Sequence, residues 1–388
     1  MHARPPPRFG TVSSHLSINS PEARPERKHA TRQKMIKPVS LIGQDKPVTL
    51  PLPTLDAFAG AGGLSLGLQA AGLLVTVAAD SSADALQTYR RHHRTAEILE
   101  GDIASHDFRR YKDSIAIVAG GPPCQPWSTG GKQLGQADGR DGLTHFLRIV
   151  DQIRPMAFLM ENVPGLTAPG NLEYLLALTR DLTELGYQVD YRILDATAFG
   201  VPQRRRRLFV VGTAPGREFT WPEATTGPGT PSPARTAGEV ISADAITGDP
   251  NPSKVTYAKN PVIRPDPFAG LLFNGGGRPL NLSAPAPTVL ASAGWNRTPW
   301  VDTKGILADY HEHLRAGGAP RSGVVPGARR LTVAEVALLQ TFPANLAFAG
   351  SRASQYIQVG NAVPPDLAAA MARALVRSLG NEAIQVAA

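Results

Sequence analysis

The chain has 388 residues, of which 42% are apolar and 19% charged, a composition that allows a sizeable core and excludes wholesale disorder. No apolar run approaches the roughly 20 residues of a membrane-spanning helix, and the N-terminus lacks the apolar stretch of a secretory signal. The single cysteine, Cys124, excludes an internal disulfide and a zinc site built on paired cysteines. We therefore expect a cytoplasmic protein of two or three domains.

The formal net charge of +8 is unevenly distributed along the chain. Residues 1–46 hold nine Lys and Arg against three Asp and Glu and are rich in Pro and Ser, which predicts a flexible basic extension. The rest of the chain is only mildly basic. A polyanionic partner is one interpretation, and a merely solvated tail is the other.

Strands alternate with helices through residues 47–213. This alternation indicates an α/β fold with a doubly wound, mostly parallel sheet. The expected elements, in chain order, are a strand entering a Gly-rich turn (48–63), a helix, a strand ending at Asp80, a helix, a short strand into Asp102, a strand at 114–121, a helix at 143–153, a strand at 156–163, a helix at 171–185, and strands at 188–194 and 207–212.

The pattern changes in the last part of the chain. Residues 214–327 are crowded with Pro and Gly and show little periodicity, which is typical of loops that carry recognition. The segment LTVAEVALLQTFP then predicts a helix opened by a capping box of Thr332 and Glu335. Residues 364–380 predict an amphipathic helix with Pro at its start and Gly at its end.

The turn DAFAGAGG follows a strand and opens a helix. Its glycines let a ligand approach the backbone, and Asp80 at the end of the next strand can accept hydrogen bonds from ribose hydroxyls. Asp102, at the end of the third strand, could meet a donor on a base. These features favour an adenosine-containing cofactor, and the early carboxylate of Asp56 favours one with an ammonium group. A tight turn with acids that face water is the alternative.

Two further positions suggest chemistry. Cys124 lies in the loop GGPPCQPWS just past an apolar strand, where a nucleophile could act, although free cysteines are more often small buried hydrophobes. Its thiol needs activation because the ordinary pKa is ~8.5. Glu161 ends the strand MAFLMENV, where its pKa could be raised and its carboxyl could donate to a ring nitrogen. A capping or ion-paired glutamate is the alternative.

The run QRRRR places four positive charges just before a strand. In an extended chain, Arg205 and Arg207 point to one face while Arg204 and Arg206 point to the other. One pair could then face a site and the other could face phosphates. A solvated surface run is the alternative interpretation.

Taken in order, the segments DAFAGAGG, GDI, GGPPCQPWS, ENV, PQRRRR, LTVAEVALLQTFP and QVGNAVPP resemble the DNA (cytosine-5)-methyltransferase family, in the order found in bacterial restriction–modification enzymes. The resemblance covers residues 54–213 and 328–379. It implies a Rossmann-like sheet of the S-adenosylmethionine-dependent methyltransferase class, with a first catalytic part at 47–213 and a C-terminal part at 328–388. A smaller target-recognition domain would lie at 214–327.

The resemblance implies transfer of a methyl group from S-adenosylmethionine to carbon 5 of a flipped-out cytosine, in a specific sequence of double-stranded DNA. Cys124 would bond covalently to the base and Glu161 would assist at ring nitrogen 3. Arg205 and Arg207 would hold the carbonyl oxygen and the sugar–phosphate, and loop 125–142 would close over the base. We expect a monomer on bacterial DNA, without metal or membrane, and a cognate restriction endonuclease could be encoded separately.

Binding residues are also implied by the resemblance. Cofactor contacts are expected at Phe58, Ala59, Gly60, Gly62, Gly63, Asp80, Asp102, Ile103, Pro123 and Asn361. DNA contacts are expected at Ser128, Gln203, Arg204, Thr288 and Arg297, with Trp295 and Asn296 as further candidates. Asn361 would close the cofactor pocket, so the last helix should pack beside the first. Departures from the family pattern stand at Ala57, Ser81 and Ala334, outside the catalytic set.

Three other functions compete with this one. A tRNA-cytosine methyltransferase could share the scaffold, but such relatives typically carry a second cysteine, which this chain lacks. A DNA-binding protein without catalysis would not need Cys124, Glu161, Arg205 and Arg207 together. A nicotinamide dehydrogenase would explain the Gly-rich turn but not GGPPCQ or QRRRR.

Overall fold

The computed structural model describes residues 51–123, 142–242, 247–274, 278–292, 294 and 297–380. All of them belong to the unit formed by residues 41–388. The expected basic extension at 1–46 lies outside the described residues, as do Cys124 and Ser128. Within the described ranges, every helix is too short or too polar to cross a membrane.

A seven-stranded sheet, in the order β3-β2-β1-β4-β5-β7-β6, forms the scaffold. Neighbouring strands run parallel from β3 to β5, and β7 is antiparallel to both β5 and β6. The predicted mostly parallel α/β sheet is confirmed. Its strands are β1 (Pro53–Ala57), β2 (Leu74–Asp80), β3 (Glu97–Glu100), β4 (Ile117–Gly120), β5 (Ala157–Asn162), β6 (Gln188–Asp195) and β7 (Arg206–Thr213).

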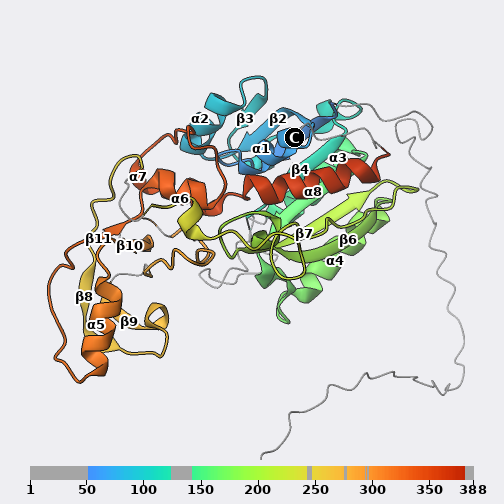
Figure 1. Ribbon diagram of the computed structural model, residues 1–388. Coiled ribbons are helices and arrows are strands. Elements are labelled where there is room, and N and C mark those ends of the chain that lie inside the picture. The colour runs from blue at the N-terminus through green and yellow to red at the C-terminus, as the bar shows by residue number, and fades with distance from the viewer. Residues whose placement is uncertain are drawn as a thin grey trace, which may run out of the picture. The chain divides into compact units, whose positions relative to one another are not determined.

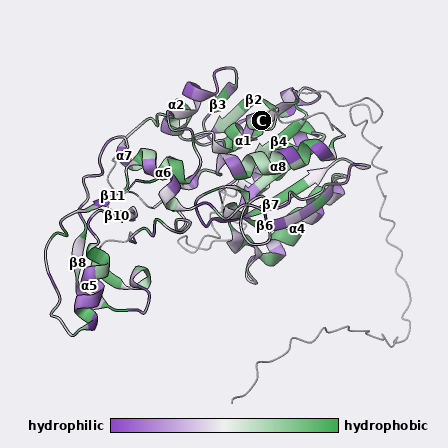
Figure 2. Cartoon of the chain, in the orientation of Figure 1, coloured by the Kyte–Doolittle hydropathy of each residue, from purple (hydrophilic) through white to green (hydrophobic). Residues whose placement is uncertain are grey.

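Helices cover both faces of this sheet (Figure 1). The central strands are apolar on both faces, as buried parallel strands require, and Figure 2 shows hydrophobic residues concentrated there. In β5, Leu159 belongs to the core under α1 and α8, whereas Phe158 belongs to the core under α3 and α4. The helices around the sheet are α1 (Gly63–Ala70), α2 (Ala83–His92), α3 (Gly142–Ile153), α4 (Leu172–Glu184) and α8 (Pro365–Ser378).

Helix α8 packs directly against α1, which confirms the expectation that the last helix lies beside the first (Figure 1). Two glycines allow this approach. A Cβ at Gly67 would lie 2.6 Å from the carbonyl oxygen of Pro365, and a Cβ at Gly63 would collide with the carbonyl oxygen of Val363. The Gly-rich turn and the C-terminal segment, far apart in sequence, therefore form one end of the sheet.

Residues 247–330 carry smaller elements that periodicity did not predict. They comprise β8 (Thr256–Val262) paired with β9 (Leu271–Asn274), β10 (Trp300–Asp302) paired with β11 (Ala328–Arg330), and helix α5 (Ile306–Arg315). Aromatic side chains form their core, with ring centroids of Phe273 and Trp300 5.0 Å apart and those of Tyr257 and Tyr310 4.8 Å apart. The limits of a target-recognition domain stay a prediction.

The segment just after β7 packs with the large sheet. Trp221 is buried in the core that includes α8, and its indole nitrogen donates to Asp190 Oδ2 at 2.6 Å. The guanidinium of Arg192 lies 5.0 Å from the centre of the Trp221 ring. The first residues of the range 214–327 thus belong structurally to the sheet.

Helix α6 (Val333–Leu339) begins with the predicted capping box, which is confirmed. Glu335 accepts from the backbone N–H of Thr332 at 2.9 Å, and its buried carboxylate also pairs with Arg329 at 2.9 Å. Helix α7 (Arg352–Asn361) follows and was not predicted. Together, α6 and α7 connect the small elements to α8.

Candidate active site

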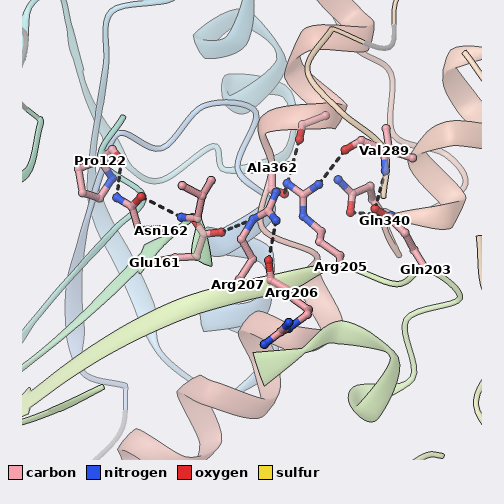
Figure 3. Close-up of polar contacts among 12 residues, drawn as sticks. Pro122, Glu161, Asn162, Gln203, Arg205, Arg206, Arg207, Val289, Gln340 and Ala362 are labelled. Atoms are coloured by element: carbon pink, nitrogen blue, oxygen red, sulfur yellow. Dashed lines mark hydrogen bonds and ion pairs between the residues drawn. The ribbon is translucent and has the colours of Figure 1, made fainter. Parts of the chain in front are cut away.

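A buried ion pair lies at the ends of two neighbouring strands. Glu161 is the second-last residue of β5, and Arg207 is the second residue of the antiparallel strand β7. Arg207 Nε lies 2.8 Å from Glu161 Oε1 (Figure 3). Burial raises the pKa of the Glu161 carboxyl, and the nearby Arg207 and Arg205 charges act against that rise. The site therefore holds a buried carboxyl group with a raised pKa beside a fixed cation.

The backbone that leads to Cys124 passes this carboxyl. A Cβ at Gly121 would lie 3.3 Å from Glu161 Oε2, so the chain runs close to the acid. Asn162 Nδ2 donates to the carbonyl oxygen of Pro122 at 3.1 Å, which fixes the chain next to Pro123, the last described residue before Gly142 (Figure 3). Cys124 itself lies outside the described residues, two positions after Pro122.

Arg205 connects three segments of the protein. Its side chain is fully buried, and Nη1 donates to Val289 O at 2.9 Å. Nη2 donates to Gly360 O at 2.8 Å and to Ala362 O at 2.9 Å. We expected this guanidinium beside a substrate, but the structure directs it to backbone carbonyls (Figure 3). Burial lowers its pKa, yet the three acceptors favour its charged form.

Gln203 makes a second internal connection beside Arg205. Its Oε1 accepts from the backbone N–H of Val289 at 2.8 Å, and its Nε2 donates to Gln340 Oε1 at 3.0 Å and to Leu339 O at 3.2 Å. The side chain is fully buried. We expected a DNA contact at this position, and the structure shows that its amide is occupied within the protein (Figure 3).

The other expected DNA contacts in the described residues lie at the surface. Arg204 and Arg297 are exposed, and Figure 3 shows Arg206 on the side of the strand opposite to Arg205 and Arg207. Thr288 Oγ1 donates to the carbonyl oxygen of Arg204 at 2.6 Å, which ties the segment 286–290 to the arginine run. Trp295, Asn296 and Ser128 lie outside the described residues.

The Gly-rich turn has an unusual backbone. Phe58 has a φ of 62° although it is not glycine, and Gly60 and Gly62 have φ of 54° and 88°. Non-glycine residues in this region concentrate at functional sites. A Cβ at Gly60 would meet no atom within 4 Å, so this side of the turn is open. The backbone N–H of Gly60 donates to Asp80 Oδ2 at 2.8 Å, which fixes the turn beside the end of β2.

Asp80 and Asp102 both hold backbone groups in place. Asp80 Oδ1 accepts from the N–H of Ser82 at 2.8 Å, and burial raises the pKa of this carboxyl. Asp102 Oδ1 accepts from the N–H of Ala104 at 2.9 Å, beside the buried Ile103. Each carboxylate retains lone pairs for a ligand. The remaining expected cofactor residues are the buried Ala59 and Gly63 and the exposed Pro123 and Asn361.

Asp56 does not face the open side of the turn. Its Oδ2 accepts from Ser65 Oγ at 2.5 Å, and Ser65 Oγ lies 2.7 Å from the hydroxyl of Tyr89. Burial raises the pKa of Asp56 to about 7, and the charge of Asp80 acts in the same direction. The ring of Tyr89 packs 4.2 Å from that of His93, whose pKa burial lowers to about 4. This polar cluster lies behind the turn, away from its open side. The carboxylate of Asp56 therefore does not bear on the charge of a ligand bound at the turn.

Sequence reasoning missed two amides of this site. Asn162 follows Glu161 directly and positions Pro122, and the ENV motif was the signal that could have identified it. Gln340 Nε2 donates to Val359 O at 2.8 Å, and Gln340 Oε1 accepts from Gln203 Nε2 at 3.0 Å. Its position at the end of α6 carried no comparable signal, because its partners lie in other segments.

Comparison with known proteins places this geometry in a family. A family model described as C-5 cytosine-specific DNA methylase matches residues 52–262 and 288–377. The type II methyltransferase M.AplI of Arthrospira platensis is 35% identical over 341 residues, which cover 85% of this chain and 87% of the relative. The type II methyltransferase M1.HphI of Haemophilus parahaemolyticus is 31% identical over 352 residues, covering 86% and 89%.

Solved structures agree on the fold. A DNA modification methyltransferase encoded within an Escherichia coli prophage superposes with a TM-score of 0.60 at 19% identity, over 85% of this chain and 99% of that protein. A variant of Spodoptera frugiperda Dnmt2 gives a TM-score of 0.63 at 17% identity, over 85% and 99%.

Proposed function

This chain belongs to the C-5 cytosine-specific DNA methylase family, and on that premise we propose that it methylates carbon 5 of cytosine within a specific sequence of duplex DNA. The observation that carries the proposal is the buried pair of Glu161 and Arg207 beside the chain that leads to Cys124. An acid with a raised pKa and a planar cation match the nitrogen and carbonyl edge of a pyrimidine.

Cys124 acts as the nucleophile. Carbon 5 of cytosine is too weak a nucleophile to take a methyl group directly. Addition of the Cys124 thiolate to carbon 6 forms a carbon–sulfur bond and turns carbon 5 into an enamine carbon. After carbon 5 has been methylated, a base removes its proton, and the electron pair released expels the thiolate.

Glu161 and Arg207 assist this addition from the other edge of the ring. The protonated carboxyl of Glu161 donates to ring nitrogen 3, which draws electrons away from carbon 6. Arg207 donates to the carbonyl oxygen and holds the ring in place. Arg205 and Gln203 act as positioning residues, since their side chains bind other parts of the protein.

The residues of the Gly-rich turn fit S-adenosylmethionine. The open side at Gly60 admits a ligand close to the backbone, Asp80 offers oxygens to ribose hydroxyls, and Asp102 with Ile103 offers a polar and an apolar contact to adenine. When bound, S-adenosylmethionine supplies the methyl group as a sulfonium. Phe58 and Asn361 would complete this site.

The target base must leave the duplex before Cys124 can reach it. Arg204, Thr288 and Arg297 would bind the DNA backbone, and the region 214–327 would read the sequence. The relatives are named as type II methyltransferases, which supports a role in restriction–modification with a separately encoded endonuclease. We propose that the protein acts as a monomer on DNA in the cytoplasm.

A methyl-transfer assay tests the proposal. The full chain is incubated with S-adenosylmethionine labelled in its methyl group and with either mixed-sequence duplex DNA or tRNA. Label in the DNA, located at cytosine by bisulfite-type sequencing, is the expected result and gives the target sequence. Label only in tRNA would overturn the choice of substrate.

A second experiment tests the nucleophile. Cys124→Ser should abolish methyl transfer while DNA binding in a mobility-shift assay changes little, because the serine hydroxyl adds to the ring far more weakly than a thiolate. Turnover at the rate of the unchanged protein would contradict the proposed chemistry.

A further inference from the structure

Helix α3 carries an arginine that binds the chain leaving β3. Arg148 is half-buried, and its Nη2 donates to the carbonyl oxygen of Ile103 at 2.7 Å. Its Nη1 donates to the carbonyl oxygen of His106 at 2.9 Å. One turn further along α3, Gln152 Oε1 accepts from the backbone N–H of Phe108 at 3.0 Å. Two side chains of one helix therefore hold three backbone groups of the same segment.

The segment 101–108 depends on these contacts for its position. Gly101 has a φ of 124°, a conformation that favours glycine, so the chain changes direction as it leaves β3. In the turn that follows, the N–H of His106 lies 3.4 Å from the carbonyl oxygen of Ile103, which is longer than an ordinary hydrogen bond. The bond from Arg148 to the same oxygen is much shorter, at 2.7 Å, and is strengthened by the charge. The guanidinium thus fixes Ile103 more firmly than the turn itself does.

The first turn of α3 lies against a second part of the proposed cofactor site. A Cβ at Gly142, the first residue of α3, would lie 2.5 Å from Cδ of Pro123, so the helix begins in close contact with the chain that follows β4. The strands β3 and β4 are not neighbours, because β2 and β1 lie between them. Helix α3 therefore sets the position of Ile103 relative to Pro123.

An arginine that merely satisfies backbone carbonyl groups is the ordinary explanation for such contacts. Arg154, directly after α3, is an example, since it donates to Leu185 O at 3.0 Å and to Asp151 O at 3.0 Å. Neither of those carbonyl groups belongs to the proposed cofactor site. Arg148 differs because it holds the residue next to Asp102, whose side chain is exposed.

We propose that Arg148 is a positioning residue for the adenine ring of S-adenosylmethionine, which holds Ile103 so that the carboxylate of Asp102 meets the amino group of the ring. The inference rests on the proposed function, which puts Asp102 and Ile103 at adenine. The amino group of adenine can donate to a carboxylate, whereas hypoxanthine has a carbonyl oxygen at the same place, which a carboxylate repels. Because hydrogen bonds weaken steeply with distance and angle, a displaced Asp102 would lose this discrimination.

Calorimetric titration with S-adenosylhomocysteine and S-inosylhomocysteine, which differ only in the base, tests the inference. The unchanged protein should bind the adenine compound at least about tenfold more tightly. Arg148→Ala should weaken binding of the adenine compound about tenfold and reduce the ratio of the two affinities below about threefold. The kcat for the target duplex at saturating S-adenosylmethionine should fall less than about threefold, because the reacting groups stay in place. Arg154→Ala is the matched control and should keep both the affinity and the ratio.

The ratio of the two affinities separates positioning from a structural role, because partial unfolding would weaken both compounds equally. Equal weakening of both compounds, no weakening of either, or equal affinity of the unchanged protein for both would overturn the inference. Arg148→Lys keeps the charge but lacks the planar fork that binds two carbonyl groups, so it should reduce the ratio by a smaller factor. This variant decides the question if Arg148→Ala does not fold, and an unaltered ratio would then contradict the inference.

Failure of the proposed function has a different signature. The unchanged protein would then bind neither compound, or would transfer no methyl group to cytosine in duplex DNA.

Discussion

Glu161 shows how a single buried side chain acquires its chemistry. The apolar strand β5 carries the carboxyl into the interior, where burial raises its pKa and the nearby charge of Arg207 limits that rise. Burial therefore favours the protonated form of this carboxyl, which can donate a hydrogen bond, more than a surface position would. Its environment rather than its identity makes it suitable as an acid.

Substitution of Glu161 should therefore remove a pH-dependent step. Glu161→Gln keeps the shape but cannot transfer a proton, so we expect the methylation rate to fall about 100-fold or more, with little loss of DNA affinity. In the unchanged protein, the rate should decline as pH rises through the raised pKa of Glu161, and this decline should vanish in the variant. Rates measured from pH 5 to 9 that are equal for both proteins would contradict the assigned role.

The raised pKa of Asp56 leads to a prediction about how the stability of the protein depends on pH. Its folded pKa of about 7 lies above its ordinary value of 3.8, so the folded state binds its proton more tightly. The associated stability is present below the ordinary pKa and is lost as pH rises through the folded pKa. Asp56→Asn should then gain stability relative to the unchanged protein between pH 5 and pH 8, by at most about 3 kcal/mol, since about two pH units separate pH 5 from the folded pKa.

Chemical denaturation at the two pH values measures this effect. Asp181→Asn, at an exposed carboxylate on α4, is the control and should give the same difference at both pH values. If Asp56→Asn behaves as this control does, the carboxyl is not held protonated in the folded state.

At the scale of elements, the arginine run fastens the segment 286–290 and the turn after α7 to the entrance of β7. Arg205→Ala would leave three carbonyl groups without their donor, which we expect to lower the free energy of unfolding by about 2–4 kcal/mol. The exposed Arg206 provides the matched control, and Arg206→Ala should have little effect.

Hydrogen exchange localises the consequence of that change. In Arg205→Ala, exchange should accelerate first in the amides of residues 286–291 and 359–363, because these segments lose their common anchor. An acceleration spread evenly over the large sheet would instead indicate general destabilisation.

The contact between α1 and α8 makes a second prediction at this scale. Gly67→Ala places a methyl group against the backbone of α8, so overpacking should outweigh the gain in helix propensity and cost about 1–3 kcal/mol of stability. Gly170→Ala adds a methyl group that meets no atom within 4 Å and should be nearly neutral. Equal thermal melting temperatures for the two variants would contradict the tight packing.

For the whole molecule, the sequence predicted the large sheet well and the small elements poorly. Apolar runs such as that of β5 predict buried parallel strands from the local sequence alone. The capping box that begins at Thr332 likewise predicted the start of α6. Strands β8 to β11 are only three to seven residues long. The aromatic residues that form the core of these strands lie far apart in the sequence, so no local pattern specifies the strands.

Some residues of the candidate site could likewise be predicted from the sequence, and others could not. Glu161 and Arg207 could be predicted because strand ends and alternation place them on one edge. The internal roles of Gln203 and Arg205 could not, since the partners of Arg205 lie 84 and 155 residues further along the chain. From the sequence alone, a charged or amide side chain is expected at the surface. Only the folded chain shows which backbone carbonyl groups accept its hydrogen bonds in the interior.

The most direct measurement concerns the bond between sulfur and the base. The full chain is incubated with S-adenosylmethionine and a duplex that carries 5-fluorocytosine at the target. Fluorine cannot leave carbon 5 as a proton does, so the thioether should persist as a complex that survives denaturation. Mass spectrometry should then locate the attached DNA at Cys124. The variant Cys124→Ser should form no such complex. Methylation of the ordinary duplex without any such complex on the fluorinated one would contradict the account.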